Sequence, residues 1–257
     1  MRYVGDVRPA APPALIVIAK EPLPGVAKTR LSPPCSPDQA AALAQAALLD
    51  TLEAVARTPA QRRVLVFEGD ARRWRTGGFE VIPQRGVGLA ERLAAAFEDV
   101  EGPALLVGMD TPQLTSQLLL EGLHALAQPT VDAVLGPSVD GGYWSVGLKS
   151  GCDRAFAGVP MSCEATWSRQ RSRLVELGLR VHDQPVLRDV DTIEDARAVA
   201  REAPDSRFAV TLASIERSML APIEKPVPAP MQRSTPTAIK RSPLVPTERS
   251  TFTPIGR

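Results

Sequence analysis

Short, uninterrupted apolar runs with helix-like segments between them constrain this chain more than any other feature. Residues 14–19 read Ala-Leu-Ile-Val-Ile-Ala, and residues 104–109 read Ala-Leu-Leu-Val-Gly-Met. A strand that is buried on both faces gives such continuous runs, whereas a half-exposed strand alternates apolar and polar residues. Residues 89–100, in contrast, repeat apolar residues at helical spacing. This alternation predicts an α/β fold with a mostly parallel sheet and helices on both of its faces.

The same pattern places the individual elements. Strands are expected at residues 14–19, 63–67, 79–83, 104–109, 131–136, 143–148 and 180–185. Helices are expected at residues 38–57, 89–100, 115–127, 164–177 and 192–203. Sheets of this kind bind ligands beyond the carboxyl ends of their strands, so the residues that follow the apolar runs are the candidate site residues.

Proline and apolar patterning divide the chain into three parts. Residues 1–13 are expected to form a loose arm, residues 14–210 one catalytic domain, and residues 221–257 a disordered tail. The tail holds eight prolines: Pro222, Pro226, Pro228, Pro230, Pro236, Pro243, Pro246 and Pro254. Such a segment buries too little apolar surface to offset the entropy lost on ordering.

Composition excludes several classes of protein. The net charge of +1 gives no basic footprint for nucleic acid and no polybasic membrane patch. The three cysteines lack CxxC spacing, which argues against a zinc site or a disulfide framework and favours a reducing compartment. We find no signal-peptide pattern and no apolar run long enough for an integral membrane segment. A cytoplasmic enzyme is therefore expected.

The loop after the first apolar run is a candidate phosphate site. It places three cations, Lys20, Lys28 and Arg30, within eleven residues of one another. Gly25 lets the backbone approach a ligand closely, and a helix directly after the loop would add free amide donors. The loop is not a Walker motif, because the glycines of that motif are absent. A plain surface loop with solvated charges is the alternative.

Asp110 follows the run at residues 104–109 within Gly108-Met109-Asp110-Thr111-Pro112. A carboxylate at the end of a central strand can bind Mg²⁺ or Mn²⁺ while the metal bridges phosphate oxygens. The alternative is that Asp110 caps the next helix.

Two further segments carry acidic residues. Residues 136–148 contain Asp140-Gly141-Gly142-Tyr143, which also fits a plain hairpin turn. Residues 188–195 contain Asp189 and Asp191, whose spacing sends both side chains to one face of an extended segment. Asp191 or Thr192 could equally cap the last expected helix. A weaker signal is Arg92, which follows a glycine-rich helix start and could add a phosphate contact.

Four segments, in this order, resemble a known family: residues 19–31, 108–112, 136–148 and 189–195. They are similar to AKxPxPGxxKTRL, GxDxP, GPxxDGGYxxxGL and DxDTxED of the arsenosugar-biosynthesis-type glycosyltransferases, a glycosyltransferase-A-like family long catalogued as a domain of unknown function. The resemblance covers about residues 15–202. It relates the chain to nucleotidyltransferases of molybdenum-cofactor and deazaflavin-cofactor synthesis, and it implies a nucleotide-diphospho-sugar transferase fold.

The resemblance also implies roles for individual residues. Lys28 and Arg30 would meet phosphates, and Asp110 would hold the Mg²⁺ or Mn²⁺ ion. Asp140 and Asp191 are the implied catalytic carboxylates. The acceptor side would be formed by Gly141, Gly142 and Tyr143.

Three functions remain open at this point. The first is metal-dependent transfer of a glycosyl unit from a nucleotide sugar to an unidentified acceptor. The second is nucleotidyl transfer from an NTP with release of pyrophosphate, and the third is a non-enzymatic nucleotide-binding module. Nucleotidyltransferases of this fold usually have a glycine-rich first loop, so the proline-rich loop here favours glycosyl transfer.

Overall fold

The computed structural model describes residues 13–74, 77–150 and 154–220. The tail expected at residues 221–257 lies outside these residues, as does the expected N-terminal arm except for residue 13.

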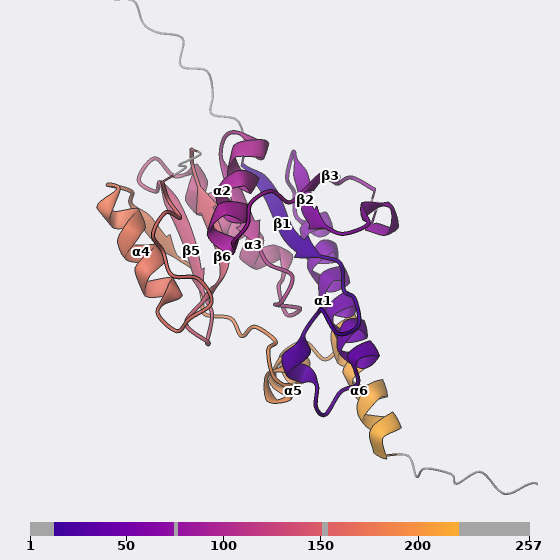
Figure 1. The fold of residues 1–257 in the computed structure, drawn as a ribbon. Helices are drawn as coiled ribbons and strands as arrows, with labels where there is room; N and C mark the ends of the chain where they lie inside the picture. The colour runs from indigo at the N-terminus through magenta and orange to yellow at the C-terminus, as the bar shows by residue number, and fades with distance from the viewer. Residues whose placement is uncertain (1–12, 75–76, 151–153, 221–257) are drawn as a thin grey trace, which may run out of the picture. The chain divides into compact units, whose positions relative to one another are not determined.

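A seven-stranded sheet forms the centre of the described fold (Figure 1). Its strands are β1 (Ala14–Lys20), β2 (Arg63–Glu68), β3 (Glu80–Pro83), β4 (Ala104–Val107), β5 (Ala133–Pro137), β6 (Tyr143–Leu148) and β7 (Val181–Asp183). Their order is β3-β2-β1-β4-β6-β5-β7. Strand β6 runs antiparallel to β4 and β5, and all the other neighbours are parallel. The prediction of a mostly parallel α/β fold is confirmed.

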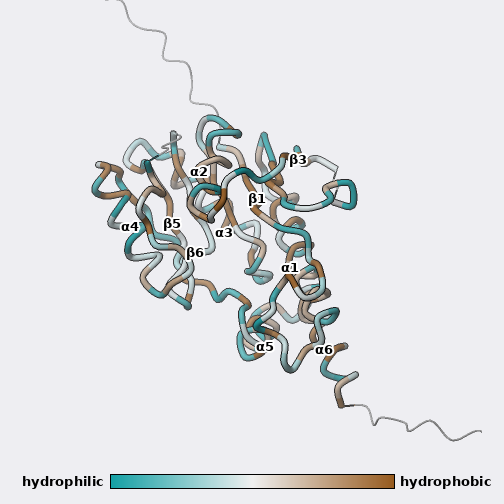
Figure 2. Tube along the Cα trace, viewed as in Figure 1, coloured by the Kyte–Doolittle hydropathy of each residue, from teal (hydrophilic) through white to brown (hydrophobic). Residues whose placement is uncertain are grey.

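Helices cover both faces of this sheet. They are α1 (Pro37–Arg57), α2 (Leu89–Val100), α3 (Ser116–Ala127) and α4 (Thr166–Glu176), with short 3-10 turns η1 (Thr29–Leu31) and η2 (Ala71–Trp74). Leu15 and Val17 of β1 pack with α1 and α3, whereas Ile16 packs with α2 on the opposite face. Successive strand residues point to opposite faces, so a strand covered on both sides must be apolar throughout. Figure 2 shows this as hydrophobic colour along the central strands and hydrophilic colour on many of the loops.

Of the two C-terminal helices, α6 (Arg207–Leu220) packs against α1, and α5 (Ile193–Glu202) packs against α6 (Figure 1). We predicted α5 but not α6, which passes the expected domain end at residue 210. Its buried residues Phe208, Leu212 and Ile215 follow helical spacing. The expected pattern ended too early because Pro204 and the residues after it resemble a chain terminus.

The helices α1, α5 and α6 share one apolar cluster with three residues from outside them, Leu31, Cys35 and Val190. Leu31 comes from the segment after β1, and Val190 lies between the two aspartates of the late motif. Both side chains are essentially inaccessible. The C-terminal helices therefore hold the cationic loop and the late acidic motif beside each other.

Within the described residues, no helix is both long and apolar enough to cross a membrane.

Candidate functional site

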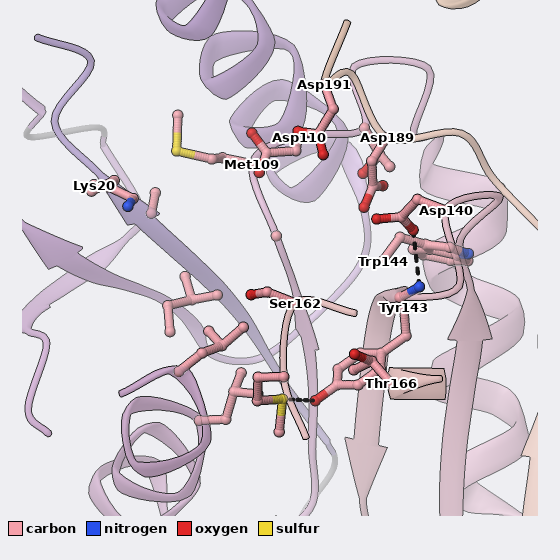
Figure 3. Close-up of a pocket in the computed structure, with 18 of the residues that line it drawn as sticks. Lys20, Met109, Asp110, Asp140, Tyr143, Trp144, Ser162, Thr166, Asp189 and Asp191 are labelled. Atoms are coloured by element: carbon pink, nitrogen blue, oxygen red, sulfur yellow. Dashed lines mark hydrogen bonds between the residues drawn. The ribbon is translucent and has the colours of Figure 1, made fainter. Parts of the chain in front are cut away.

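A cavity of about 870 Å³ opens at the carboxyl ends of β1 and β4 (Figure 3). Strand β6 runs the opposite way, so its amino end, Tyr143, also lies there. The lining includes nine of the predicted site residues: Lys20, Lys28, Arg30, Arg92, Asp110, Asp140, Gly142, Tyr143 and Asp191. The fold thus brings residues from five separate segments to one place.

Lys28 lies at the centre of the charged part of this cavity. Its Nζ atom is 2.8 Å from Asp110 Oδ1 and 3.3 Å from Asp191 Oδ1, and its side chain is only 10% exposed. Burial alone would lower the pKa of Lys28, but the charges of Asp110, Asp191 and Asp189 outweigh it and raise the pKa. Lys28 is therefore a fixed cation surrounded by carboxylates.

The backbone of the loop positions Lys28. Lys28 itself adopts a left-handed conformation, with φ 50° and ψ 43°. The helix expected at residues 38–57 is confirmed as α1, which begins at Pro37, and η1 lies between it and the loop. The first amides of α1 are already engaged by the capping box of Ser36 and Gln39, so they offer little to a ligand.

The other predicted phosphate-binding residues take different positions. Arg30 is 75% exposed and its Nη1 is 3.2 Å from Asp191 Oδ2. Lys20 lines the cavity from the end of β1 (Figure 3). Gly25 has a positive φ of 74° in the loop but is not part of the cavity wall among the residues described. Arg92 lines the cavity and is tied to Glu68 and to Gln84 Oε1.

Asp110 lies three residues beyond the end of β4, lines the cavity, and its side chain is 44% exposed. It does not cap the next helix, since Thr115 Oγ1 accepts the hydrogen bond from Leu118 N. The backbone carbonyl of Asp110 accepts a hydrogen bond from Val190 N at 3.0 Å. This bond holds the late motif beside the end of β4.

In the late motif, the cap of α5 is Thr192, with Asp195 completing a capping box. Asp191 therefore does not cap the helix, and its carboxylate forms ion pairs with Lys28 and Arg30.

Asp189 stands out in the sequence for its spacing, but we did not predict it as a site residue. Its Oδ2 accepts a hydrogen bond from Ser138 Oγ at 3.1 Å, while its buried Oδ1 has no partner among the described residues. Burial raises the pKa of Asp189, and the nearby Asp110 and Asp140 charges raise it further, to about 7. The i, i+2 spacing of Asp189 and Asp191 was the sequence signal, but the hydrogen bond from Ser138, which directly follows β5, could not be predicted from that spacing.

The acidic residues suit a hard divalent cation by chemistry. No group of three or more His, Cys, Asp or Glu side chains in the described parts of the chain is already arranged around one metal position. Asp189, whose buried Oδ1 has no partner among the described residues, is however part of the same cavity wall as Asp110. Oxygen ligands of this kind are those that Mg²⁺ and Mn²⁺ prefer, so the donor set fits such an ion.

The β5–β6 connection carries Asp140 on the tip of a hairpin, so the turn interpretation of this motif is correct, and the functional role of Asp140 stays a prediction. Asp140 is exposed, and its Oδ1 accepts a hydrogen bond from Gly142 N at 2.9 Å. Gly141 has φ 90°, and a Cβ atom there would lie 2.2 Å from the Glu164 carbonyl oxygen. Gly141 thus serves the docking of the hairpin against the start of α4, since it does not itself line the cavity in the described structure.

The two aromatic residues after the hairpin turn, Tyr143 and Trp144, make different contacts. Tyr143 lines the cavity, and its hydroxyl lies 3.4 Å from Gln170 Oε1 and 3.7 Å from Met161 Sδ. Burial raises the pKa of Tyr143, so its hydroxyl stays neutral. Trp144 is buried, and its Nε1 donates to Pro185 O at 3.0 Å, which is a structural contact.

Comparison with known proteins agrees with this fold. A crystal structure of a proposed nucleotide-diphospho-sugar transferase from Desulfovibrio desulfuricans G20 matches with a TM-score of 0.72 and 28% identity, covering 82% of this chain and 96% of that one. The manganese complex of Rv0371c from Mycobacterium tuberculosis H37Rv has a TM-score of 0.47 and 19% identity, covering 75% of this chain and 100% of the other. A 4-diphosphocytidyl-2C-methyl-D-erythritol synthase has a TM-score of 0.48 and 16% identity, with coverages of 76% and 99%.

A search of curated proteins finds no match. Residues 44–163 match the family model described as "uncharacterized protein conserved in bacteria (DUF2064)". The chain thus has the fold of the nucleotide-diphospho-sugar transferases, and its central residues, from α1 to the segment before α4, match this bacterial family.

Proposed function

We propose that this protein transfers a glycosyl unit from a nucleotide sugar to an acceptor hydroxyl in a reaction that requires Mg²⁺ or Mn²⁺. The main observation in support is that the Lys28 ammonium lies in one cavity with Asp110, Asp191 and Asp189. A site with both a buried cation and several carboxylates suits a metal-bound diphosphate, because phosphate oxygens can pair with the cation and the metal with the carboxylates.

The chain's own cations would bind the diphosphate. The Lys28 ammonium has three donors and already points to the centre of the cavity, so it can exchange a carboxylate partner for a phosphate oxygen. Arg30 and Lys20 lie on the exposed side of the loop, where they would add charge at the cavity mouth. A metal held by Asp110 and Asp189 would neutralise charge that develops on the departing diphosphate.

Asp140 would act on the acceptor. Its exposed carboxylate on the hairpin tip can accept the proton of an acceptor hydroxyl. The acceptor oxygen then bonds to the anomeric carbon as the bond from that carbon to the diphosphate breaks, and the nucleoside diphosphate leaves. The similar protein from Desulfovibrio desulfuricans G20 and the motif resemblance to arsenosugar-biosynthesis-type glycosyltransferases support this reaction class.

The proposal includes a cytoplasmic location. Cys35 and Cys163 are both unpaired thiols in the described structure, as is usual in a reducing compartment.

Thermal denaturation with a panel of ligands tests the proposal. We expect a UDP- or GDP-sugar to raise the melting temperature of the wild type in the presence of Mn²⁺ and to do so much less for Asp110→Asn. An effect of NTPs alone would favour nucleotidyl transfer instead. If no nucleotide changes the melting temperature, with or without Mn²⁺, the proposed function is wrong.

A further inference from the structure

We propose that the acceptor carries an apolar group, an alkyl chain or a ring, beside its reacting hydroxyl, and that this group binds the apolar wall of the cavity. The apolar wall consists of the partly exposed Ile18, Tyr143 and Met161, backed by the buried Leu93, Leu106 and Val146. The inference rests on the proposed function, since it names the acceptor class for the same site.

The wall lies where the sheet meets helices α2 and α4. Ile18, Leu106 and Val146 come from β1, β4 and β6, and their side chains belong to the same apolar cluster as those of α2 and α4. Leu106 and Val146 are directly opposite each other in the β4–β6 pairing. Of these three side chains Ile18 is partly exposed, so it can contact a ligand in the cavity, whereas Leu106 and Val146 are almost inaccessible and support the wall from behind.

None of the six side chains of the wall carries a charge. The one polar atom among them, the Tyr143 hydroxyl, is directed toward Gln170 and Met161, so the aromatic ring is what the wall can offer to a ligand. Met161 adds a flexible thioether that adapts to irregular apolar shapes. The wall therefore favours hydrocarbon over a second sugar or a phosphate.

Two further apolar residues that line the cavity are exposed. Leu89 and Val87, both of which line it, are 44% and 91% exposed. Large apolar side chains left exposed beside a cavity are typical of a surface that a ligand covers.

The position of the wall favours the acceptor over the nucleotide. The cations that would hold the diphosphate belong to the loop after β1, whereas Tyr143 and Met161 follow the hairpin that carries Asp140. In Figure 3, Lys20 lies on one side of the cavity, and Tyr143 lies on the other side, next to Asp140. A hydroxyl at Asp140 would place its attached carbon chain along Tyr143 and Met161.

Methyl NMR of protein labelled with [methyl-¹³C]methionine tests this placement directly. We would titrate full-length protein with 1-butanol, 1-hexanol and 1-octanol, and with glycerol as the polar counterpart. We expect the Met161 signal to shift with the alcohols and the Met219 signal, from the exposed end of α6, to stay unchanged. Each added methylene should tighten binding about fourfold until the wall is filled.

Two variants sharpen the experiment. Met161→Gln identifies the Met161 signal by its loss and should weaken octanol binding about tenfold, whereas Met219→Gln should leave it unchanged. If Met161→Gln fails to fold, the wild-type titration with its dependence on chain length is sufficient to decide. An unchanged Met161 signal, or equal binding of glycerol and octanol, would overturn the inference.

A parallel titration with UDP, GDP and Mn²⁺ separates the two proposals. Nucleotide binding that leaves the Met161 signal and octanol affinity unchanged supports both. Displacement of octanol by the nucleotide would assign the wall to the base and overturn the inference, while the proposed function would stand. Octanol binding without any nucleotide binding would contradict the proposed function.

Discussion

Two carboxylates of this protein, Asp132 and Asp189, differ in their hydrogen bonds, and their pKa values are shifted in opposite directions. Asp132, just before β5, accepts hydrogen bonds from Arg180 N at 3.0 Å, Nε at 2.7 Å and Nη2 at 2.9 Å. These bonds hold its pKa well below the ordinary range. Asp189 has one bond, from Ser138, and one buried oxygen without a partner among the described residues, and its pKa rises to about 7.

This difference separates a structural carboxylate from one prepared for a ligand. Arg180 satisfies Asp132 completely, and the pair joins the segment before β7 to the start of β5. A half-satisfied buried carboxylate weakens the folded state, so the fold retains Asp189 at a cost in stability. Such costs are common where a protein binds or reacts, and a cation from outside would relieve this one.

Of the substitutions considered, Asp110→Asn should cause the largest loss of nucleotide-sugar affinity. We expect Asp110→Asn to lower the affinity for a nucleotide sugar with Mn²⁺ at least about a hundredfold, because it removes a candidate metal ligand. Isothermal titration and urea denaturation would be measured together. The matched Asp132→Asn should show the reverse pattern, with affinity kept and stability reduced. If the two variants lost affinity and stability equally, the distinction between ligand-binding and structural carboxylates would be wrong.

Lys28→Ala should weaken nucleotide-sugar binding about ten- to a hundredfold, the loss expected for one charge-assisted hydrogen bond in a buried site. Arg30→Ala should weaken it less, since Arg30 is 75% exposed and its charge is screened by solvent. Circular dichroism of both variants controls for folding. Unchanged nucleotide affinity in both would remove the phosphate-binding role of the loop.

Asp189→Asn should change stability in a pH-dependent way. A carboxylate whose pKa is about 7 in the folded protein and about 4 when unfolded contributes its full stability below pH 4 and loses it as pH rises through 7. Asp110 and Asp140 raise this pKa, while Ser138 and Lys28 lower it. The variant should therefore match the wild type near pH 4 and exceed it at pH 8 by on the order of a few kcal/mol.

Urea denaturation without metal, at pH 4.5, 6 and 8, would measure this effect. Asp132→Asn supplies the contrast, because the lowered pKa of Asp132 gives stability that is present at pH 8 and lost on acidification. Equal stabilisation by Asp189→Asn at all three values would show that Asp189 is not a strained carboxylate.

Much of the fold was predictable because its determinants are local. Continuous apolar runs mark buried strands such as β1, and the capping box at Ser36 marks the start of α1. The place of β6 between β4 and β5 was not predictable, because strand order depends on contacts between distant segments. Helix α6 was not predicted although its buried residues follow helical spacing; that apolar face packs against α1 and α5.

The candidate site divides in the same way. Lys28, Asp110 and Asp191 could be selected because each lies after a strand or in a charged loop. The contacts of Lys28 with Asp110 and Asp191 could not be predicted, because these aspartates lie 82 and 163 residues further along the chain. The unpartnered oxygen of Asp189 likewise results from its burial beside Ser138, 51 residues earlier.

Removal of residues 221–257 should have the smallest effect. In the described chain the last buried side chain of α6 is Ile215, and Leu220 at the helix end is 83% exposed, so a truncation after Leu220 leaves the described core intact. We expect the melting temperature to stay within about 2 °C of the wild type, which corresponds to less than about 1 kcal/mol, and nucleotide affinity to stay within about twofold. A truncation after Glu202, which removes α6 and exposes its apolar partners on α1, is the matched control and should melt far lower. A loss of stability or affinity on removing the tail alone would show that residues 221–257 contribute to the fold or the cavity, and the boundary between tail and catalytic domain would then have to move.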